Sequence, residues 1–258
     1  YSVSHLLTAK EPLIRTRPFR APHHTVSVQA LTGGGRRPKP GEISLATGGI
    51  LFLDEFPEFS RAALETLRQP LEEREVTVSR VEASVTYPAN FQLVAAMNPC
   101  PCGHFPDRSR CRCTDGQITR YLQKVSGPML DRIDICVEAS PITYGDIRSS
   151  GNNESSREIR ARVEQARKIQ GERFAGENIR CNGEMSGRHI RKFCWLGREE
   201  EKFMEEIFKK LALSARMHDR ILKVARTTAD LAEEEKIRLA DLCEAVSYVK
   251  SRDKFWGN

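Results

Sequence analysis

Short runs of apolar residues in the first half of the chain predict the strands of one sheet. The runs cover residues 50–53, 91–96 and 133–137, and each ends close to polar residues. The first run, ILFL, follows two glycines and stops at Asp54 and Glu55. A short apolar run bounded in this way is typical of a strand covered on both faces, as in a parallel sheet.

The segment between the first two runs predicts a helix and then a β-hairpin. Ala63, Leu64, Leu67 and Leu71 recur at helical spacing, and Pro70 is expected to disturb the last turn of that helix. In EVTVSRVEASVTYP, small apolar residues alternate with polar ones, which is typical of a solvent-facing β-hairpin.

The pattern changes at a turn-rich stretch, residues 145–156, and is helical from there to the end. A charged amphipathic helix is expected at residues 158–173 and a last helix at about residues 239–250. Ser214 is a good N-cap for a helix between them. An apolar stripe at four-residue spacing predicts one more helix, through Phe203, Ile207 and Leu211.

These patterns predict an α/β fold class with two domains. Residues 1–145 form a parallel-sheet domain with the β-hairpin as an insert. Residues 146–156 form a linker, and residues 157–258 form an all-helical domain.

The composition is typical of a soluble globular protein, with 29% charged and 39% hydrophobic residues among 258. No apolar run approaches 18 residues and no signal-like stretch lies near the start, so we expect no membrane partner and a cytoplasmic location. Because the chain opens on Tyr1 in mid-pattern, we expect it to be part of a longer protein.

The net charge of +6 is concentrated near the start of the chain. Residues 1–40 carry seven basic residues and a single acid, Glu11. Their net charge of +6 equals that of the whole chain. Such a bias is a modest indication of a phosphate or nucleic-acid partner. Taken alone, a solvated basic face explains it more simply.

Polar residues at the predicted strand ends suggest phosphate chemistry. Ligands of parallel sheets bind at the carboxyl ends of the strands, where Asp54, Glu55 and Asn98 would lie. One acid could hold Mg²⁺, the next could orient or deprotonate a water, and the amide could hold that water or a terminal phosphate. The alternatives are a solvated acidic turn and an asparagine that forms a turn before Pro99.

Five segments carry a family resemblance. RPFRAPHHTVS, KPGEISLATGGILFLDE, AAMNPCPCG, GPMLDRIDI and ILKVARTTADL occur in this order. Together they resemble the Mg-chelatase-like AAA+ ATPases of the YifB/ComM competence group, over nearly the whole chain. The resemblance implies a partial AAA+ domain followed by a helical lid domain, with ATP and Mg²⁺ as cofactors and a homo-oligomeric ring, a hexamer, as the assembly.

The resemblance also implies roles for single residues. Asp54 becomes the Mg²⁺-binding acid, Glu55 the catalytic acid and Asn98 the first sensor. Arg132, in LDRID, matches the arginine finger that reaches the nucleotide of a neighbouring subunit; a surface salt-bridge cluster with its flanking acids is the alternative. Arg216 is our choice for the nucleotide-binding second sensor, and Arg226 is the less favoured candidate.

One departure from the family pattern limits what this segment can do. The family binds phosphates through a G-x-x-x-x-G-K-[ST] loop, and the sequence contains no such run. By the family order, that loop would come just before Tyr1. We therefore expect ATP binding and hydrolysis from the complete chain, and an inactive fragment without it.

Two inserts suggest contacts with DNA. GGGRRPKPGE and the hairpin correspond to the helix-2 insert and the pre-sensor hairpin that line the pore in related motors. Arg36, Arg37, Lys39 and Arg80 are the candidate DNA-binding residues, because flexible cationic loops suit a sequence-independent grip on phosphates. Structural turns are the alternative. The pair His23 and His24 lacks metal-ligand spacing and is interpreted as packing or hydrogen-bonding residues.

Four of the eight cysteines predict a structural Zn²⁺ site. Cys100, Cys102, Cys111 and Cys113 lie in CPCGHFPDRSRCRC, and four thiolates give the closed tetrahedral shell of such sites. His104 could replace one thiol, and coincident reduced thiols are the alternative. The other cysteines are interpreted as ordinary buried or idle thiols: Cys136, Cys181, Cys194 and Cys243.

The sequence thus predicts part of an ATP-hydrolysing ring motor that acts on DNA. The resemblance implies helicase or branch-migration work in recombination during natural transformation. One rival is the motor subunit of a magnesium chelatase, which the cysteine cluster disfavours. A truncated, non-enzymatic binding module is the other rival, and an upstream phosphate loop would exclude it.

Overall fold

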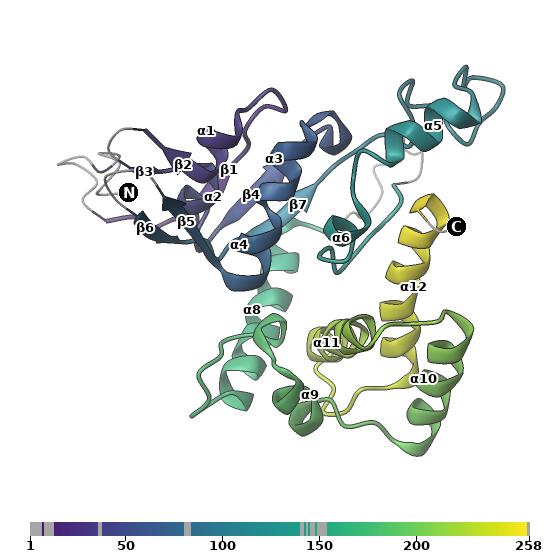
Figure 1. The fold of residues 1–258 in the computed structure, drawn as a ribbon. Coiled ribbons are helices and arrows are strands. Elements are labelled where there is room, and N and C mark those ends of the chain that lie inside the picture. Colours follow the sequence, from purple (N-terminus) through teal and green to yellow (C-terminus); the bar gives the residue numbers. More distant parts are fainter. Residues whose placement is uncertain are drawn as a thin grey trace. The chain divides into compact units, whose positions relative to one another are not determined.

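The computed structural model describes residues 7, 13–35, 38–79, 84–139, 142, 144, 148 and 154–256. The chain divides into two compact units, Tyr1–Ile133 and Asp134–Asn258, called here the sheet unit and the helical unit. The sheet unit combines a parallel sheet with short helices, and the helical unit contains helices only among its described residues (Figure 1). The predicted α/β fold class, a partial sheet domain followed by a helical region, is confirmed.

The sheet has three parallel strands in the order β1 (Phe19–Arg20), β4 (Ile50–Leu53) and β7 (Gln92–Ala95) (Figure 1). The central strand β4 buries Leu51 and Leu53 completely, which explains its apolar sequence. Two of the three predicted strands are therefore confirmed.

The third predicted strand, at residues 133–137, is wrong. These residues form no strand, and Ile135 and Val137 are 51% and 70% exposed. A strand is stable only when its backbone groups find partners on a neighbouring strand. No described strand pairs with the outer edge of β7, where Val94 is 37% exposed. The third strand is instead β1, whose two residues are too few for a recognisable pattern.

A close backbone approach fixes the start of β4. The amide of Ile50 donates to the carbonyl of Pro18 at 2.8 Å, which begins the pairing of β1 with β4. A Cβ at Gly49 would lie 1.9 Å from the Pro18 carbonyl oxygen, so a side chain is excluded there. The second glycine before the apolar run is thus required by packing.

Pro70 divides the predicted helix. The structure has α3 (Arg61–Thr66) and α4 (Arg68–Glu73), which meet at Leu67. Proline lacks the amide that would bond to the carbonyl four residues earlier, so the continuous helix is interrupted at this point. The other short helices of the sheet unit are α1 (Val28–Thr32), α2 (Glu42–Leu45), η1 (Phe56–Glu58), α5 (Asp115–Leu122) and α6 (Gly127–Leu130).

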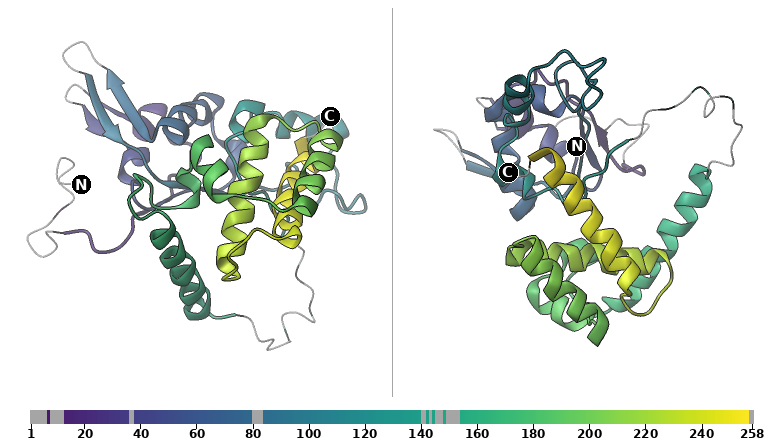
Figure 2. Two further views of the ribbon diagram at one scale, coloured as in Figure 1. Left: turned by 90° about the horizontal axis from the view of Figure 1, so that it is seen from below. Right: turned by 90° about the vertical axis from the view of Figure 1, so that its right-hand side faces the viewer.

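The predicted hairpin is confirmed. Strands β5 (Glu75–Ser79) and β6 (Ser84–Pro88) pair antiparallel and project from the rest of the sheet unit (Figure 2). Val76 and Val78 are each 4% exposed, so one face is buried. On the other face, paired hydroxyl groups lie 3.0 Å apart: Thr77 with Thr86 and Ser79 with Ser84.

The helical unit packs around one apolar core that includes Ile221 and Leu242. Ser214 caps its helix as predicted, since its hydroxyl accepts from the amide of Met217 at 3.2 Å. The helices are α8 (Ser156–Arg173), η2 (Asn182–Glu184), α9 (Gly187–Phe193), α10 (Arg198–Lys210), α11 (Ala215–Leu231) and α12 (Leu239–Trp256).

The helix at the end of the chain is longer than the predicted span of residues 239–250. Most of the predicted linker, residues 146–156, lies outside the described residues, so the domain limits stay a prediction. Within the described ranges, no helix is both long and apolar enough to cross a membrane.

Candidate active site

The ends of β4 and β7 bring the predicted catalytic residues to one edge of the sheet. Leu53 lies beside Ala95 in the parallel register, and the amide of Ala96 donates to the carbonyl of Leu53 at 2.9 Å. Asp54 and Glu55 leave the sheet from β4, and Asn98 follows β7 by three residues. We call this set of three residues the strand-end site. The predicted strand-end arrangement therefore has its backbone framework in place.

The two acids of the strand-end site lie in a strained turn and face solvent. Glu55 has a φ of 53°, a left-handed conformation that costs a non-glycine residue roughly 1–2 kcal/mol. Its side chain is 55% exposed. Among the described residues, the Asp54 side chain accepts one hydrogen bond, from the Glu55 amide at 2.9 Å. Carboxylate oxygens therefore remain accessible to a hard cation or a water.

His24 contacts the predicted catalytic acid. Its Nδ1 lies 2.9 Å from a carboxylate oxygen of Glu55, and its ring packs against His23 at 4.0 Å between centroids. Its ring also meets Phe59 edge-on at 6.4 Å. The interpretation of both histidines as packing or hydrogen-bonding residues is confirmed. The partner was not foreseen, because the contact joins positions 31 residues apart.

Asn98 is exposed and lies against the cysteine-rich loop that follows it. A Cβ at Gly103 would be 3.8 Å from the Asn98 amide group, in ordinary van der Waals contact. Within the described part of the chain, no hydrogen bond joins Asn98 to Glu55. The structure therefore places the amide and the acid at the same edge without direct contact.

Arg132 is held by contacts inside the sheet unit. Its Nη2 lies 2.6 Å from Glu72, its Nη1 donates to the carbonyl of Pro128, and its side chain is only 11% exposed. The flanking acid Asp134 pairs with Arg220 at 3.2 Å. The acid paired with Arg132 is thus Glu72 of α4, while Asp134 pairs elsewhere.

The two candidate second sensors differ sharply in environment. Arg216 is exposed in the first turn of α11. Arg226 is 2% exposed and donates to the carboxylate of Asp230 at 3.1 Å and to the carbonyls of Glu234 and Glu235. Burial lowers the pKa of the Arg226 guanidinium, and the Asp230 charge opposes this shift. Arg226 is thus committed to internal contacts, whereas Arg216 is accessible.

Asp230 is the centre of a buried polar group of residues in the helical unit, which we call the Asp230 network. The Asp230 carboxylate accepts hydrogen bonds from Arg173 and Asn182, both at 2.7 Å, in addition to Arg226. Asp230 is fully buried and Asn182 is 1% exposed. The sequence did not suggest this network, because Arg173 and Asp230 lie 57 residues apart.

Of the four candidate DNA contacts, only Lys39 lies within the described residues. It is exposed on β3 (Lys39–Pro40), which pairs with β2 (Gly33–Gly34). The hydroxyl of Tyr87 donates to the carbonyl of Pro38 at 2.9 Å and so joins this small ribbon to the β5–β6 hairpin. Arg36, Arg37 and Arg80 lie outside the described residues.

The four clustered cysteines converge on one point. Their sulfur atoms all lie within 4.8 Å of one another, and His104 is exposed and not part of the group. A hydrogen bond from the His104 backbone lowers the pKa of Cys102 to about 6, and burial raises the pKa of Cys111 to about 11. The cluster is a candidate metal site. Elsewhere, burial raises the pKa of Cys194 to about 12, as expected for an idle thiol.

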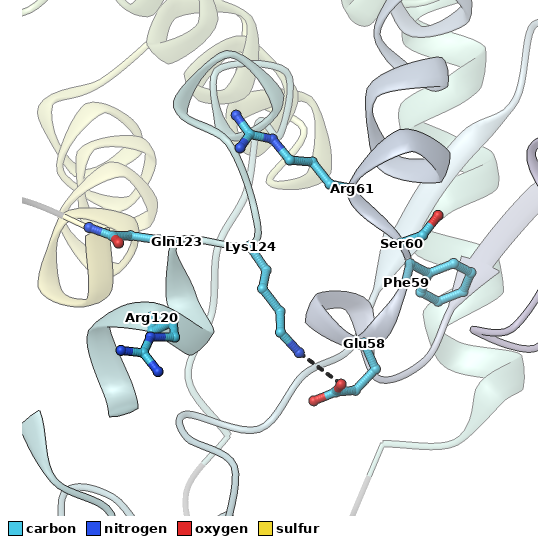
Figure 3. A pocket seen from close by; sticks show the side chains of 7 residues that line it. All are labelled: Glu58, Phe59, Ser60, Arg61, Arg120, Gln123 and Lys124. Atoms are coloured by element: carbon cyan, nitrogen blue, oxygen red, sulfur yellow. Dashed lines mark hydrogen bonds and ion pairs between the residues drawn. The ribbon is translucent and has the colours of Figure 1, made fainter. Parts of the chain in front are cut away.

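A hollow on the sheet unit contains none of the predicted site residues (Figure 3). Within it, the ammonium of Lys124 points to Glu58 and lies 2.9 Å from its carboxylate, so one positive charge is already neutralised (Figure 3). The lining residues are Glu58, Phe59, Ser60, Arg61, Arg120, Gln123 and Lys124.

Comparison with known proteins gives two family matches. The family model described as "Magnesium chelatase, subunit ChlI" matches residues 1–147, and the model described as "Magnesium chelatase, subunit ChlI C-terminal" matches residues 153–249. Together, these models account for both the sheet-containing part and the helical part of the chain.

Individual relatives agree with the family models. The chain is 48% identical to "Competence protein ComM" of Haemophilus influenzae and 47% identical to "Uncharacterized protein YifB" of Escherichia coli, each over 91% of this chain. It is 28% identical to "Magnesium-chelatase 67 kDa subunit" of Heliobacterium mobile over 55% of this chain and 20% of that protein.

The chain spans about half the length of the curated relatives ComM and YifB, 45% and 46% respectively. The family matches nevertheless extend over the strand-end site and the cysteine cluster, and they continue through the helical unit. The chain therefore belongs to the magnesium chelatase ChlI family of AAA+ proteins, in the group that includes ComM and YifB.

Proposed function

We propose that this chain supplies the strand-end site and the lid of an ATPase that works as a ring-shaped motor on DNA. The observation that carries this proposal is the parallel pairing of β4 with β7, which brings Asp54, Glu55 and Asn98 to one edge of the sheet. Acid and amide groups at adjacent parallel strand ends are suited to phosphoryl transfer to water.

The strand-end site fits Mg²⁺ and ATP as cofactors. Exposed carboxylate oxygens are the donors that Mg²⁺ prefers, and Asp54 offers them directly after β4. When bound, Mg²⁺ neutralises phosphate charge. Glu55 accepts a proton from the attacking water, and Asn98 orients that water or the terminal phosphate. Arg216, accessible on α11, contacts the nucleotide as the second sensor.

Arg132 acts on the nucleotide of a neighbouring subunit in this proposal. A guanidinium neutralises the charge that develops in phosphoryl transfer, and a ring of identical subunits, a hexamer, would supply it across each interface. Its ion pair with Glu72 at 2.6 Å must then be exchanged for the phosphate when subunits assemble. Before assembly, the ion pair with Glu72 would keep the Arg132 guanidinium in place.

The β2–β3 ribbon and the β5–β6 hairpin of the sheet unit are the proposed DNA contacts. The link between Tyr87 and Pro38 supports this proposal, because it joins the ribbon that bears Lys39 to the β5–β6 hairpin, and Arg80 directly follows β5 in the sequence. With Arg36 and Arg37, these cations would grip the phosphate backbone without reading sequence. The work proposed is helicase or branch-migration activity in recombination and natural transformation, consistent with the name of the competence protein ComM. ATP and DNA meet in the cytoplasm, which we assign as the location.

A magnesium chelatase motor subunit is the second candidate. The similarity to the 67 kDa magnesium-chelatase subunit of Heliobacterium mobile favours it, but over 55% of this chain only. The ComM and YifB relatives match 91% of the chain at much higher identity, so we prefer the competence-group function, for which we propose the DNA motor. A non-enzymatic binding module would not explain why Glu55 keeps a strained backbone and an exposed carboxylate.

The deciding experiment is an ATPase assay of the full-length protein with and without single- and double-stranded DNA. We expect DNA to stimulate hydrolysis, and the Glu55→Gln protein to show no stimulated rate. Two results together would favour the chelatase function instead: an ATPase rate that does not change when DNA is added, and magnesium insertion into a porphyrin by a reconstituted complex. Absence of ATPase activity under all conditions would favour the binding module.

A further inference from the structure

We propose that Cys100, Cys102, Cys111 and Cys113 bind one structural Zn²⁺ ion, and that the loop closed by this ion holds Asn98 in position at the strand-end site. The first half of the proposal stands on the cysteine cluster alone. The second half rests on the proposed ATPase function.

The sulfur positions match a tetrahedral metal site. The Sγ atom of Cys100 lies 3.4 Å from that of Cys102 and 3.8 Å from that of Cys111, and the Cys102 to Cys111 distance is 3.6 Å. Four thiolates at the usual Zn–S distance of about 2.3 Å form a tetrahedron with edges of about 3.8 Å. A disulfide would require about 2.0 Å. The cluster therefore has the spacing of a metal-binding shell before any ion is added.

Two tight turns present the sulfur atoms to the common centre. In the first, the Gly103 amide donates to the Cys100 carbonyl at 3.0 Å, and Gly103 has a φ of 79° that favours glycine. The Phe105 amide donates to the Cys100 sulfur at 3.4 Å, which stabilises negative charge on it. In the second turn, the Cys111 amide donates to the Asp107 carbonyl at 2.8 Å.

The loop between the two cysteine pairs lacks a hydrophobic core of its own. Six of the eight residues at positions 103–110 are exposed, whereas Cys100 is fully buried and Cys111 is 8% exposed. The exposed ion pair between Arg108 and Asp115 adds little stability. The loop is therefore held by tight turns and exposed polar contacts rather than by apolar burial, and a metal cross-link between its ends would stabilise it.

The same loop lies beside the strand-end site. Asn98 precedes Cys100 by two residues, and a Cβ added at Gly103 would lie 3.8 Å from the Asn98 amide group, so the turn at Gly103 lies beside Asn98. On its far side, Cys113 precedes the cap of α5, where the Thr114 amide donates to Gln117 at 2.9 Å. The ion would therefore tie the Asn98 segment to α5 and limit the movement of the amide.

Asn98 is the group through which the metal would affect hydrolysis. A displacement of a positioning group by about 1 Å can slow a reaction about 10²-fold, without loss of substrate binding. We therefore expect loss of the ion to lower kcat by about 10- to 100-fold while nucleotide affinity stays within about 3-fold of the original.

The metal is tested on full-length protein purified without chelator. We expect zinc at about one ion per chain, and cobalt in its place should give the charge-transfer and ligand-field bands of a tetrahedral tetrathiolate. The double variant Cys111→Ser, Cys113→Ser should lose the ion, while the control Cys243→Ser, an exposed thiol in the helical unit, should keep it. Zinc far below one per chain in the unaltered protein, with no cobalt bands after reconstitution, would overturn the site.

The link to Asn98 is tested by a double-mutant cycle. Zinc is removed from the unaltered protein and from an Asn98→Ala protein, and kcat is measured before and after removal. If the ion acts through Asn98, its removal should slow the unaltered protein about 10- to 100-fold and the Asn98→Ala protein less than about 3-fold. Equal losses in both would overturn the link. Circular dichroism checks that each protein stays folded. An inactive but zinc-loaded unaltered protein would refute the ATPase function and the link, and would leave the metal site standing.

Discussion

Two groups of polar residues, the Asp230 network and the strand-end site, are built in opposite ways. In the network, Asp230 is fully buried and accepts hydrogen bonds from Arg173, Asn182 and Arg226. In the strand-end site, Glu55 is more than half exposed and its described partner is His24. The Asp230 carboxylate has its hydrogen-bond partners within the protein, whereas the carboxylate oxygens of the strand-end site remain accessible to solvent.

The difference shows how to separate structural charges from functional ones. A buried charge is tolerated when its neighbours satisfy it, and its removal leaves those neighbours unpaired. Exposed acids in a left-handed turn gain little from the fold, since Glu55 adopts a φ of 53° without becoming buried. Strained backbone positions of this kind cluster at functional sites, which is the basis of our proposal for Glu55.

Arg132 is the hardest test of this rule and has the largest expected effect. It is 11% exposed and paired with Glu72, like a structural residue, yet it is our proposed arginine finger. Removing such a finger costs about 10³- to 10⁵-fold in kcat. We expect Arg132→Ala in the full-length protein to lose that much ATPase activity, measured at saturating ATP.

Subunit mixing locates the action of Arg132. Arg132→Ala subunits mixed with Glu55→Gln subunits should regain part of the activity, because some interfaces then hold one intact residue of each kind. The control Glu72→Gln removes the ion pair and keeps the guanidinium, so it should stay active. No recovery at any ratio, with mixed assembly verified, would assign Arg132 a role within its own subunit.

Glu55→Gln should have the next largest effect. The amide keeps the shape of the side chain and loses the base, so kcat should fall about 10²- to 10⁴-fold while ATP binding persists. Because the side chain is exposed, thermal unfolding should hardly change. Glu58→Gln, which alters an exposed acid three residues away, is the matched control and should leave kcat intact. Rapid hydrolysis by Glu55→Gln would remove this residue from the mechanism.

Arg226→Ala should act on stability. It leaves the buried carboxylate of Asp230 short of a partner, which typically lowers the free energy of unfolding by about 3–5 kcal/mol. Chemical denaturation of the full-length protein, followed by circular dichroism, measures the loss. Arg162→Ala breaks an exposed ion pair with Glu154 and should shift Tm by less than about 2 °C. Similar small shifts for both variants would mean that burial does not distinguish the two classes.

Local patterns carried the sequence predictions that succeeded. The strands at residues 50–53 and 92–95 follow from apolar runs, and the hairpin follows from alternation over adjacent positions. The cysteine cluster was foreseen because its members lie within a stretch of 14 residues. Each of these signals is complete within a short window of sequence.

Pairings between distant segments were the predictions that failed or were missed. The run at residues 133–137 is largely apolar, but no strand among the described residues pairs with it, and periodicity cannot show whether a partner exists. The contact of His24 with Glu55 and the pair of Arg132 with Glu72 join positions 31 and 60 residues apart. Only the packing of the folded chain brings such residues together.

Arg216 gives the comparison of exposed and buried charges within one helix, because Arg226 lies ten residues away on α11. Arg216 is exposed, so Arg216→Ala should change Tm by less than about 2 °C. A charge-assisted hydrogen bond to a phosphate would still be lost, and ATP affinity of the full-length protein should fall about 10-fold. Titration with a fluorescent ATP analogue measures the change. The control Arg167→Ala, an exposed arginine on α8, should leave affinity unaltered. Arg216→Lys keeps the charge and should restore part of the affinity for ATP. If Arg216→Ala binds ATP as tightly as the unaltered protein, Arg216 has no nucleotide-binding role.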